Sequence, residues 1–408
     1  MTDNYKKPRL RYFEEASSQR HIAGQDRYLY GSGEPRFRLA IIGTGTIGQE
    51  HMRVATMIGV AQVHGIYDRN AHSMDVAAEE YARYADNELV RYGDLESACN
   101  DPDVDALFLC TPNFSHIDVF EVAAKSGKPI FLEKPMATTV EDARRIFEIA
   151  TDYPSCIQVG LQYRYKAPYV EAYHEALERG TVGNIKTISM SEYRPPFLDK
   201  VEQWNKFAEY SGGTLVEKCC HYFDLMNLFA GALPVRVYAS SGQAVNFLDF
   251  EREGRASDID DHGFVIIDYE NGVRGNFTLN MFSPHFYEEL VICGDRGRLL
   301  ATETFDFLTD DVAHSRVAIE LGEEGASRDT AVGYAKPIEQ SGHHGATFFE
   351  HLAFIDHLDG KETDAATPLE GLWSIIVAAA AQESSETGAP VEIKQFIEGH
   401  QLAKAVGL

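Results

Sequence analysis

The chain has 408 residues, 44% of them hydrophobic, and a formal net charge of −26 at neutral pH. This length is enough for two or three domains with a substantial apolar core. The strong negative charge disfavours nucleic acid and anionic membranes as partners, and no apolar run is long enough for a membrane span. The six cysteines include no CxxC pair, so neither a disulfide framework nor a zinc site is indicated. We expect a cytoplasmic protein with reduced thiols and no metal.

The first segment, residues 1–36, is polar, contains several tyrosines and arginines, and ends in a Gly-Ser-Gly-Glu-Pro stretch. Such a composition indicates an N-terminal arm with a flexible joint rather than part of a packed domain. The arm is either disordered or packs on a neighbouring subunit, because chain termini are loose unless they are tied down.

Strands alternate with helices over residues 37–161. The pattern predicts strands at 37–43, 62–67, 89–90, 105–110, 129–133 and 156–161, and helices at 46–58, 73–84, 115–127 and 139–151. Strands and helices of these lengths, in this order, are typical of a doubly wound parallel sheet with right-handed crossovers. We therefore predict an α/β dinucleotide-binding domain of the Rossmann type.

The pattern changes in residues 162–396. Strands are predicted at 186–194, 234–242, 262–272, 273–282 and 288–301, helices at 344–358 and 368–387, and an edge strand at 391–396. The Asn271-Gly272 pair is a strong hairpin signal. These features predict an α+β second domain built on a large, mostly antiparallel open sheet.

A glycine motif joins the first predicted strand to the first helix. It reads G-x-G-x-x-G and contributes Gly43, Gly45, Thr46, Ile47 and Gly48 as candidate cofactor-binding residues. The first glycine permits a tight turn, the second lets the backbone approach a pyrophosphate, and the third allows close packing of helix on strand. The helix N-terminus offers free N–H groups to the phosphates.

The second predicted strand is followed by Asp68, about 20 residues beyond the motif, where a carboxylate binds the ribose 2′-hydroxyl. This carboxylate would repel a 2′-phosphate, which favours NAD as the cofactor. NADP remains an alternative, because the next residue, Arg69, is a possible partner for that phosphate.

Two further segments, residues 107–139 and 211–231, together with the glycine motif, resemble the Gfo/Idh/MocA family, named for glucose-fructose oxidoreductase and inositol dehydrogenase. The marks are Glu133-Lys134-Pro135 at the end of a strand and a Gly-Gly…His-x-x-Asp stretch that ends at Asp224. The resemblance spans roughly residues 37–395. It implies hydride transfer between a nicotinamide and a secondary hydroxyl of a sugar, cyclitol or related polyol. It also implies a homodimer or homotetramer that associates through the second sheet.

The chemistry of alcohol oxidation assigns roles to the matching residues. Removal of hydride from a carbinol requires a base for the hydroxyl proton, and His221 has a pKa suited to this. Lys134, at the carboxyl end of a strand, is placed to stabilise negative charge on the oxygen. Glu217 stands where the family usually has Asp, and Cys219 where it usually has Gly. If the turn is helical, Glu217 shares a face with His221 and orients the substrate or raises the basicity of the histidine.

Other residues match family positions in the cleft. Expected cofactor contacts are Thr111, Asn113, His116, Glu133 and Lys134, and expected substrate contacts are Lys134, Tyr163, Arg164, Glu217 and His221. For His116 the alternative is an exposed residue of a first helical turn. Asp224 is expected to be a structural carboxylate that bonds a neighbouring loop.

Two other polar clusters have less specific patterns. The acidic run Asp258–His262 precedes a predicted strand, and we interpret it as a solvated turn rather than a metal site. His343-His344 either lines the mouth of the site or caps the helix that follows.

Three functions are consistent with these features. The first is an NAD-dependent sugar or inositol dehydrogenase, and the second is a glycoside-processing enzyme that oxidises a sugar carbon of a glycoside. The third is a cofactor-binding regulator without turnover, because a fold alone does not imply activity. A regulator has no need of Lys134 and His221 together, so the sequence favours an enzyme acting on CH–OH groups.

Overall fold

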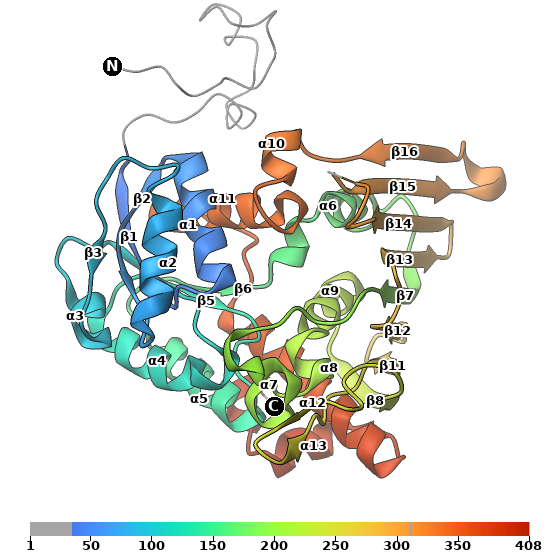
Figure 1. Cartoon of the computed structure of the whole chain (residues 1–408). Helices are drawn as coiled ribbons and strands as arrows, with labels where there is room; N and C mark the ends of the chain where they lie inside the picture. Colours follow the sequence, from blue (N-terminus) through green and yellow to red (C-terminus); the bar gives the residue numbers. More distant parts are fainter. Residues whose placement is uncertain (1–34, 311, 408) are drawn as a thin grey trace, which may run out of the picture.

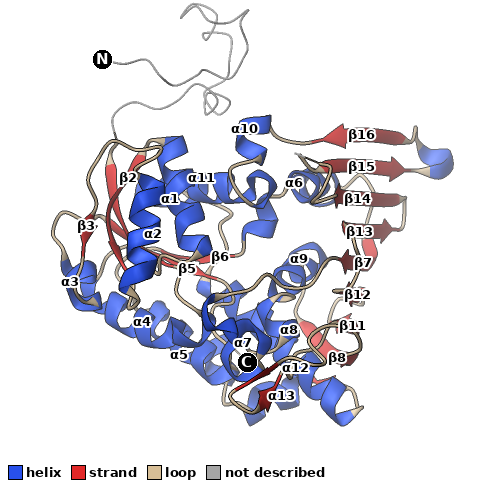
Figure 2. Ribbon diagram, viewed as in Figure 1, coloured by secondary structure: helices blue, strands red, loops and turns tan. Residues whose placement is uncertain are grey.

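The computed structural model describes residues 35–310 and 312–407. Two sheets dominate it, a six-stranded one and a nine-stranded one, with helices between them (Figures 1 and 2). The predicted N-terminal arm, residues 1–36, lies outside the described residues except for its last two. Among the helices that are described, none has the length and apolar character needed to cross a membrane.

The six-stranded sheet has the order β3-β2-β1-β4-β5-β6, and every pairing in it is parallel. Its strands are β1 Phe37–Ile42, β2 Ala61–Tyr67, β3 Val90–Arg91, β4 Ala106–Leu109, β5 Ile130–Glu133 and β6 Ile157–Gly160. Its helices are α1 Thr46–Ile58, α2 Ala71–Tyr81, α3 Leu95–Asn100, α4 His116–Ala123 and α5 Val140–Thr151. The predicted Rossmann sheet is confirmed. The short α3 was not predicted; it begins where the Asp94 side chain accepts the N–H of Ser97.

The nine-stranded sheet has the order β16-β15-β14-β13-β7-β12-β11-β8-β17 and is antiparallel except where β12 pairs with β7. Its strands are β7 Ile185–Tyr193, β8 Pro234–Gly242, β11 His262–Tyr269, β12 Arg274–Asn280, β13 Phe286–Gly294, β14 Arg298–Phe305, β15 His314–Glu320, β16 Arg328–Val332 and β17 Val391–Glu392. The predicted mostly antiparallel sheet is confirmed. The run predicted at 288–301 is divided between β13 and β14 by a turn, and β15 and β16 were not predicted.

Helices occupy the space between the two sheets (Figure 2). The longer ones are α9 Cys220–Ala230, α11 Ala346–Leu358 and α12 Pro368–Thr387, and the shorter ones are α6 Ala167–Tyr173, α7 Ala208–Ser211, α8 Thr214–Glu217, α10 Lys336–Glu339, α13 Ile393–Gly399 and α14 Ala403–Val406. A small hairpin, β9 Glu251–Arg252 and β10 Arg255–Ala256, stands apart from both sheets. Because α12 packs on β8 and also on α5, it joins the two domains.

The C-terminal edge differs from the prediction of a strand over 391–396. Only β17 pairs with β8, and the chain then turns into α13. In α13, Ile393, Phe396 and Ile397 are buried with the spacing of a helical face, and this packing outweighs the strand-like composition of the segment.

A single large apolar cluster spans both domains. It includes Leu132 and Val159 of the parallel sheet, Phe277 of the second sheet, and Ile376 of α12. A shared core of this kind holds the two domains in a fixed relation, so that the carboxyl ends of β1, β4 and β5 face the second domain across a defined cleft.

Candidate active site

A cavity with a volume of about 660 Å³ lies in this cleft. Its walls come from the loops after β1, β2, β4 and β5, from the segment after β7, and from the α8–α9 region. The volume falls within the range of known cofactor and ligand pockets. Its position agrees with the rule that open α/β sheets bind ligands outside the carboxyl ends of their strands.

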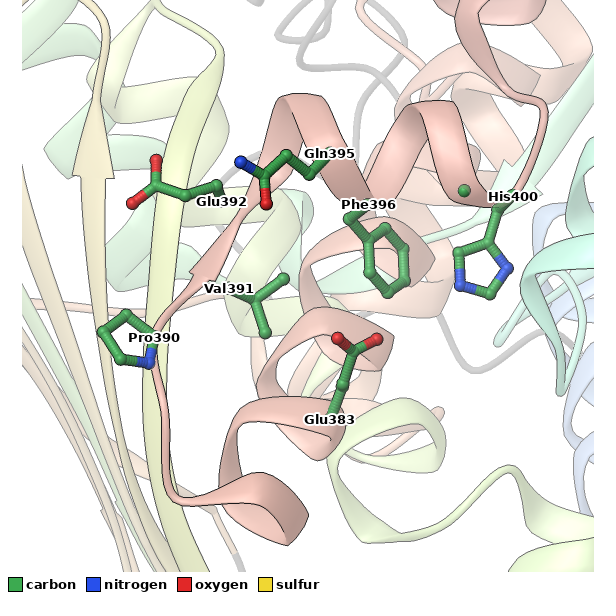
Figure 3. A pocket seen from close by; sticks show the side chains of 8 residues that line it. Glu383, Pro390, Val391, Glu392, Gln395, Phe396 and His400 are labelled. Atoms are coloured by element: carbon green, nitrogen blue, oxygen red, sulfur yellow. The ribbon is translucent and has the colours of Figure 1, made fainter.

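A smaller cavity of about 230 Å³ lies between the end of α12, β17 and α13 (Figure 3). It is lined by Glu383, Pro390, Val391, Glu392, Gln395, Phe396, Gly399 and His400. None of the residues selected from the sequence lines it, so the larger cavity is the candidate active site.

The glycine motif forms one end of the larger cavity. Gly43 has a φ of 94°, and a Cβ added there would lie 2.5 Å from the backbone carbonyl of Cys110. A Cβ on Gly48 would lie 2.0 Å from the carbonyl oxygen of Gly43, whereas no described atom lies within 4 Å of the corresponding point on Gly45. The loop is thus closely packed at Gly43 and Gly48 and open at Gly45. The N-cap of α1 is Gly45, which has no side chain to bond the first N–H groups of the helix. These groups are therefore free for a pyrophosphate.

The backbone fixes Asp68 beside this loop. Its Oδ2 accepts the N–H of Thr44 at 2.9 Å, and its Oδ1 accepts the N–H of Asn70 at 2.9 Å. Asp68 and Arg69 both line the cavity, and the Arg69 guanidinium lies 5.9 Å from the ring centre of Phe114. The residue types and their placement therefore fit a dinucleotide with its adenosine ribose at the end of β2.

The remaining expected cofactor residues divide into two groups. Thr111, Asn113, Glu133 and Lys134 line the cavity. His116 does not: its ring is fully buried, with its nitrogens 2.8 Å from the carbonyl oxygen of Pro135 and 2.9 Å from that of Thr111. The expectation that His116 faces the cleft is therefore corrected, because its ring joins the loops that follow β4 and β5.

The other end of the cavity brings together Lys134, Tyr163, Glu217 and His221. The Nζ of Lys134 donates to the backbone carbonyl of Glu217 at 3.2 Å. The ring of His221 stacks on that of Tyr163, with centroids 4.1 Å apart and planes 8° from parallel. Within residues 35–310 and 312–407 the buried Nδ1 of His221 has no hydrogen-bond partner, and the imidazole is held by its stacking on Tyr163.

The protonation states of these two residues differ. Burial lowers the pKa of His221 well below its ordinary value, and the charges of Lys134 and Lys218 lower it further. Burial also opposes the charge on Lys134, but the carboxylates of Glu217 and Glu133 raise its pKa above the ordinary value. At neutral pH the site therefore holds an uncharged imidazole and an ammonium group, as a base and an electrostatic stabiliser require.

The two departures from the family pattern lie in a helical turn. Glu217 ends α8, and Lys218 and Cys219 keep helical backbone angles up to the start of α9. The Oε2 of Glu217 is buried, and no described group bonds it. Cys219 is fully buried and packs in the core that α9 forms with the sheet. Glu217 lines the cavity, and Cys219 does not.

Arg164 lies outside the cavity. Its guanidinium donates two hydrogen bonds to Asp224, of 2.7 and 2.6 Å, and one to Glu370, of 2.7 Å. The expectation that Arg164 contacts substrate is corrected, because two carboxylates occupy its donors. The expectation that Asp224 bonds a neighbouring loop is confirmed, since Arg164 lies in the loop after β6.

Several lining residues escaped the sequence analysis. Arg194 and Lys200 follow β7, and Lys218 points from the α8–α9 turn. The Nζ of Lys218 lies 2.6 Å from the hydroxyl of Tyr163 and 3.0 Å from Glu192. The only signal in the sequence concerned Arg194, a basic residue at the end of the strand predicted at 186–194 and directly before two prolines.

The histidine pair near the C-terminus is divided between two sites. His343 lines the cavity and bonds Glu50 at 2.7 Å, whereas His344 bonds the buried Glu303 at 2.6 Å. Burial by itself would raise the pKa of Glu50, but the charge and hydrogen bond of His343, with the hydroxyl of Thr347, lower it to about 2. His343 thus belongs to the cavity mouth, one of the two alternatives left open by the sequence.

The acidic run at 258–262 is a structural turn. Asp261 accepts backbone N–H groups from Ala244, Val245 and Asn246 at 2.7–3.1 Å. Its carboxylate is therefore saturated by the loop that it organises, which supports the interpretation of this run as a turn.

Comparison with known proteins gives two family matches. Residues 37–161 match "Oxidoreductase family, NAD-binding Rossmann fold", and residues 174–393 match "Oxidoreductase family, C-terminal alpha/beta domain", both of the GFO_IDH_MocA group. Similar proteins include scyllo-inositol 2-dehydrogenase (NAD(+)) of Bacillus subtilis, 25% identical over 88% of this chain and 97% of that protein. Myo-inositol 2-dehydrogenase of Thermotoga maritima is also 25% identical, over 88% of this chain and 99% of its own length. A solved structure of levoglucosan dehydrogenase with NADH shares the fold, with a TM-score of 0.71 at 20% identity over 88% of this chain and 99% of its own.

Proposed function

Because the chain belongs to the Gfo/Idh/MocA family of NAD-binding oxidoreductases, we propose that it oxidises a secondary hydroxyl of a sugar, cyclitol or related polyol. The inositol dehydrogenases among its relatives support this substrate class. The observation that carries the proposal is the pairing, in one cavity, of an unbonded neutral His221 with a cationic Lys134.

The residues that would hold the cofactor are those of the glycine loop, with Asp68 at the ribose and Thr111, Asn113 and Glu133 along the cleft. We favour NAD over NADP, because the carboxylate of Asp68 is fixed by two backbone N–H groups and would repel a 2′-phosphate. When bound, the nicotinamide supplies the acceptor for the hydride of the carbinol carbon.

The chain's own side chains handle the proton. The neutral imidazole of His221 accepts the hydroxyl proton as the carbon–oxygen bond becomes a carbonyl. Lys134 donates a hydrogen bond to that oxygen and stabilises the negative charge that develops on it. Glu217 lines the same end of the cavity and orients the ring through a second hydroxyl. Tyr163 keeps the imidazole plane in place by stacking.

The test is the reduction of NAD and of NADP by the purified protein with inositol isomers, aldoses and glycosides, compared between the wild-type protein and Lys134→Met. Loss of a transition-state donor costs on the order of 10²–10³ in kcat, so turnover should fall by this factor. The affinity for NADH, measured by fluorescence, should change far less. Tight NADH binding with no turnover of any polyol or glycoside would instead indicate a cofactor-binding regulator.

A further inference from the structure

Positive charge gathers at the catalytic end of the cavity. Lys134, Arg194, Lys200 and Lys218 all line it. Two of these charges act to lower the pKa of their neighbours. Arg194 acts on Lys134, Arg194 and Lys134 act on Lys218, and Lys134 acts on Lys200. Such a concentration contrasts with the net charge of −26 of the whole chain.

The carboxylates elsewhere in the cavity compensate this group only in part, because they have closer partners of their own; Glu133 and Glu50 still act on Lys200 at longer range. Asp199 pairs with Lys206 at 2.8 Å, and Glu202 lies 3.5 Å from Arg252. Glu50 is bound by His343, and Glu133 by His51 at 2.9 Å. Among the described carboxylates near the four cations, Glu217 and Glu192 have no ion-pair partner outside this group.

Glu192 is shared. It is fully buried in β7 and lies 3.0 Å from the Nζ of Lys218 and 3.5 Å from the Nη1 of Arg194. One carboxylate thus balances two cations, while the Nε of Arg194 donates to the carbonyl of Pro195 at 3.0 Å. The guanidinium is held in position with donor capacity left over.

Lys200 has no carboxylate within ion-pair distance among the residues that the structure describes, and its side chain is only partly exposed. Burial is the first cause of its lowered pKa, and the charges of Glu217, Glu133 and Glu50 offset this effect only in part. A partly buried charge without a partner costs stability unless a ligand supplies the opposite charge.

From these charges we infer that the substrate carries an anionic group, a carboxylate or a phosphate, which Arg194 and Lys200 bind while Lys134 and His221 act on a hydroxyl. The inference rests on the proposed oxidation of a polyol and narrows its substrate to acidic sugars or cyclitols. An arginine fork matches either oxyanion, and an ammonium that lines the same cavity supplies a second charge-assisted bond.

The pyrophosphate of the dinucleotide is the other anion that this cavity would hold. The free N–H groups for it lie at Gly45 and the start of α1, in the first domain. Arg194 and Lys200 follow β7 in the second domain, and the largest electrostatic effects on Lys200 come from Glu217 and Lys134, at the catalytic end, ahead of those from Glu133 and Glu50. The placement therefore assigns the two cations to the substrate.

The experiment compares matched substrates that differ in charge. NAD reduction is followed with D-glucose against D-glucuronate and glucose 6-phosphate, D-galactose against D-galacturonate, and myo-inositol against its monophosphate. We expect kcat/KM for at least one anionic member to exceed that of its neutral partner by tenfold or more; the carboxylate and phosphate arms show which oxyanion is used.

Lys200→Gln should raise the KM for that substrate roughly 10-fold or more, and Lys200→Arg should restore most of the loss. Lys186→Gln, an exposed lysine of β7 away from the cavity, is the control and should change nothing.

A binding measurement separates this inference from the proposed function. The same acids and phosphates are titrated into the NADH complex of the wild-type protein and of Lys200→Gln by calorimetry. Binding that depends on Lys200 without any turnover supports the anion site and contradicts the dehydrogenase. Turnover of neutral polyols at least as efficient as that of their charged partners supports the dehydrogenase and overturns the anion site. An increase in the Kd for NADH in Lys200→Gln, with no effect on the acids, also overturns it, by assigning the lysine to the cofactor.

Discussion

At the residue scale, His221 is set apart by its charged surroundings. Burial is the first cause of its lowered pKa, and Lys134, Lys218, His343 and Lys166 all add positive charge around it. A histidine whose pKa is depressed stays neutral, and so competent as a base, until the pH falls below that depressed value. For Lys134 the shift is upward, so that its ammonium persists to high pH.

These directions predict the pH dependence of oxidation. The acid limb of kcat/KM should lie below the ordinary histidine pKa of about 6.5, and no alkaline limb from Lys134 should appear below about 10.5. The measurement is kcat/KM from pH 5 to 10 with saturating NAD and a substrate without a group that titrates in this range. Lys218→Met removes one of the facing charges and should move the acid limb upward. A limb at or above 6.5 in the wild-type protein would contradict the lowered pKa of this imidazole.

The site was predictable from the sequence where its residues lie in local motifs. Lys134 follows a buried strand, and His221 lies in a recognisable stretch, so each was found without tertiary information. Arg194 and Lys200 were missed because only the fold brings the segment after β7 to the carboxyl edge of the other sheet. Arg164 was assigned wrongly for the same reason, since the partners that occupy it, Asp224 and Glu370, are distant in sequence.

At the element scale, the turn between β1 and α1 separates two uses of glycine. Gly48 faces the carbonyl of Gly43, where a Cβ would lie at 2.0 Å, whereas Gly45 faces open space in the cavity. Gly48 therefore serves the packing of helix on strand, and Gly45 serves the approach of a ligand to the backbone.

Two substitutions distinguish these roles. Gly48→Ala should lower both Tm and NADH affinity, because the backbone of Gly43 must move; overpacking of this kind costs about 1–3 kcal/mol. Gly45→Ala should leave Tm nearly unchanged, since its φ of −68° is ordinary for alanine, but should weaken NADH binding by intruding on the pyrophosphate. Calorimetric Tm and NADH titration of both variants provide the check. Equal loss of Tm in the two would contradict this division.

Elements with strong periodicity were predicted with nearly correct bounds, among them α1, α11 and α12. The errors lie where pairing or packing decides. The turn between β13 and β14 is formed by Asp295, Arg296 and Gly297 within an otherwise strand-like run. The segment after β17 becomes a helix because its apolar side chains find the core only in that conformation.

At the scale of the whole molecule, one face of the nine-stranded sheet carries no helix among the elements that are described (Figures 1 and 2). Phe264 and Ile266 of β11 are 60% and 50% exposed on it, and Tyr238 of β8, paired with Ile266, is 41% exposed. Tyr193 of β7 lies on the same face. Adjacent exposed aromatic and aliphatic side chains on a sheet are typical of a protein–protein contact.

We propose that two copies of the chain associate through this face. Each copy carries a net charge of −26, and this mutual repulsion disfavours association except through a surface where apolar burial dominates. The exposed face of β8 and β11 supplies such a surface, and it would place the catalytic cavities on the far sides of the pair, because the cleft lies on the helical side of the sheet.

The double variant Phe264→Thr/Ile266→Thr tests this association, since threonine keeps the strand propensity while removing apolar area. Light scattering at micromolar protein should report a dimer or tetramer for the wild-type chain and a smaller species for the variant. Val76→Thr, an exposed apolar residue of α2 in the first domain, serves as the control and should leave the mass unchanged. High salt screens the repulsion between copies, so added NaCl should strengthen association of the wild-type chain while leaving the variant dissociated. A wild-type monomer, or a variant that keeps the wild-type mass, would contradict the assignment of this face.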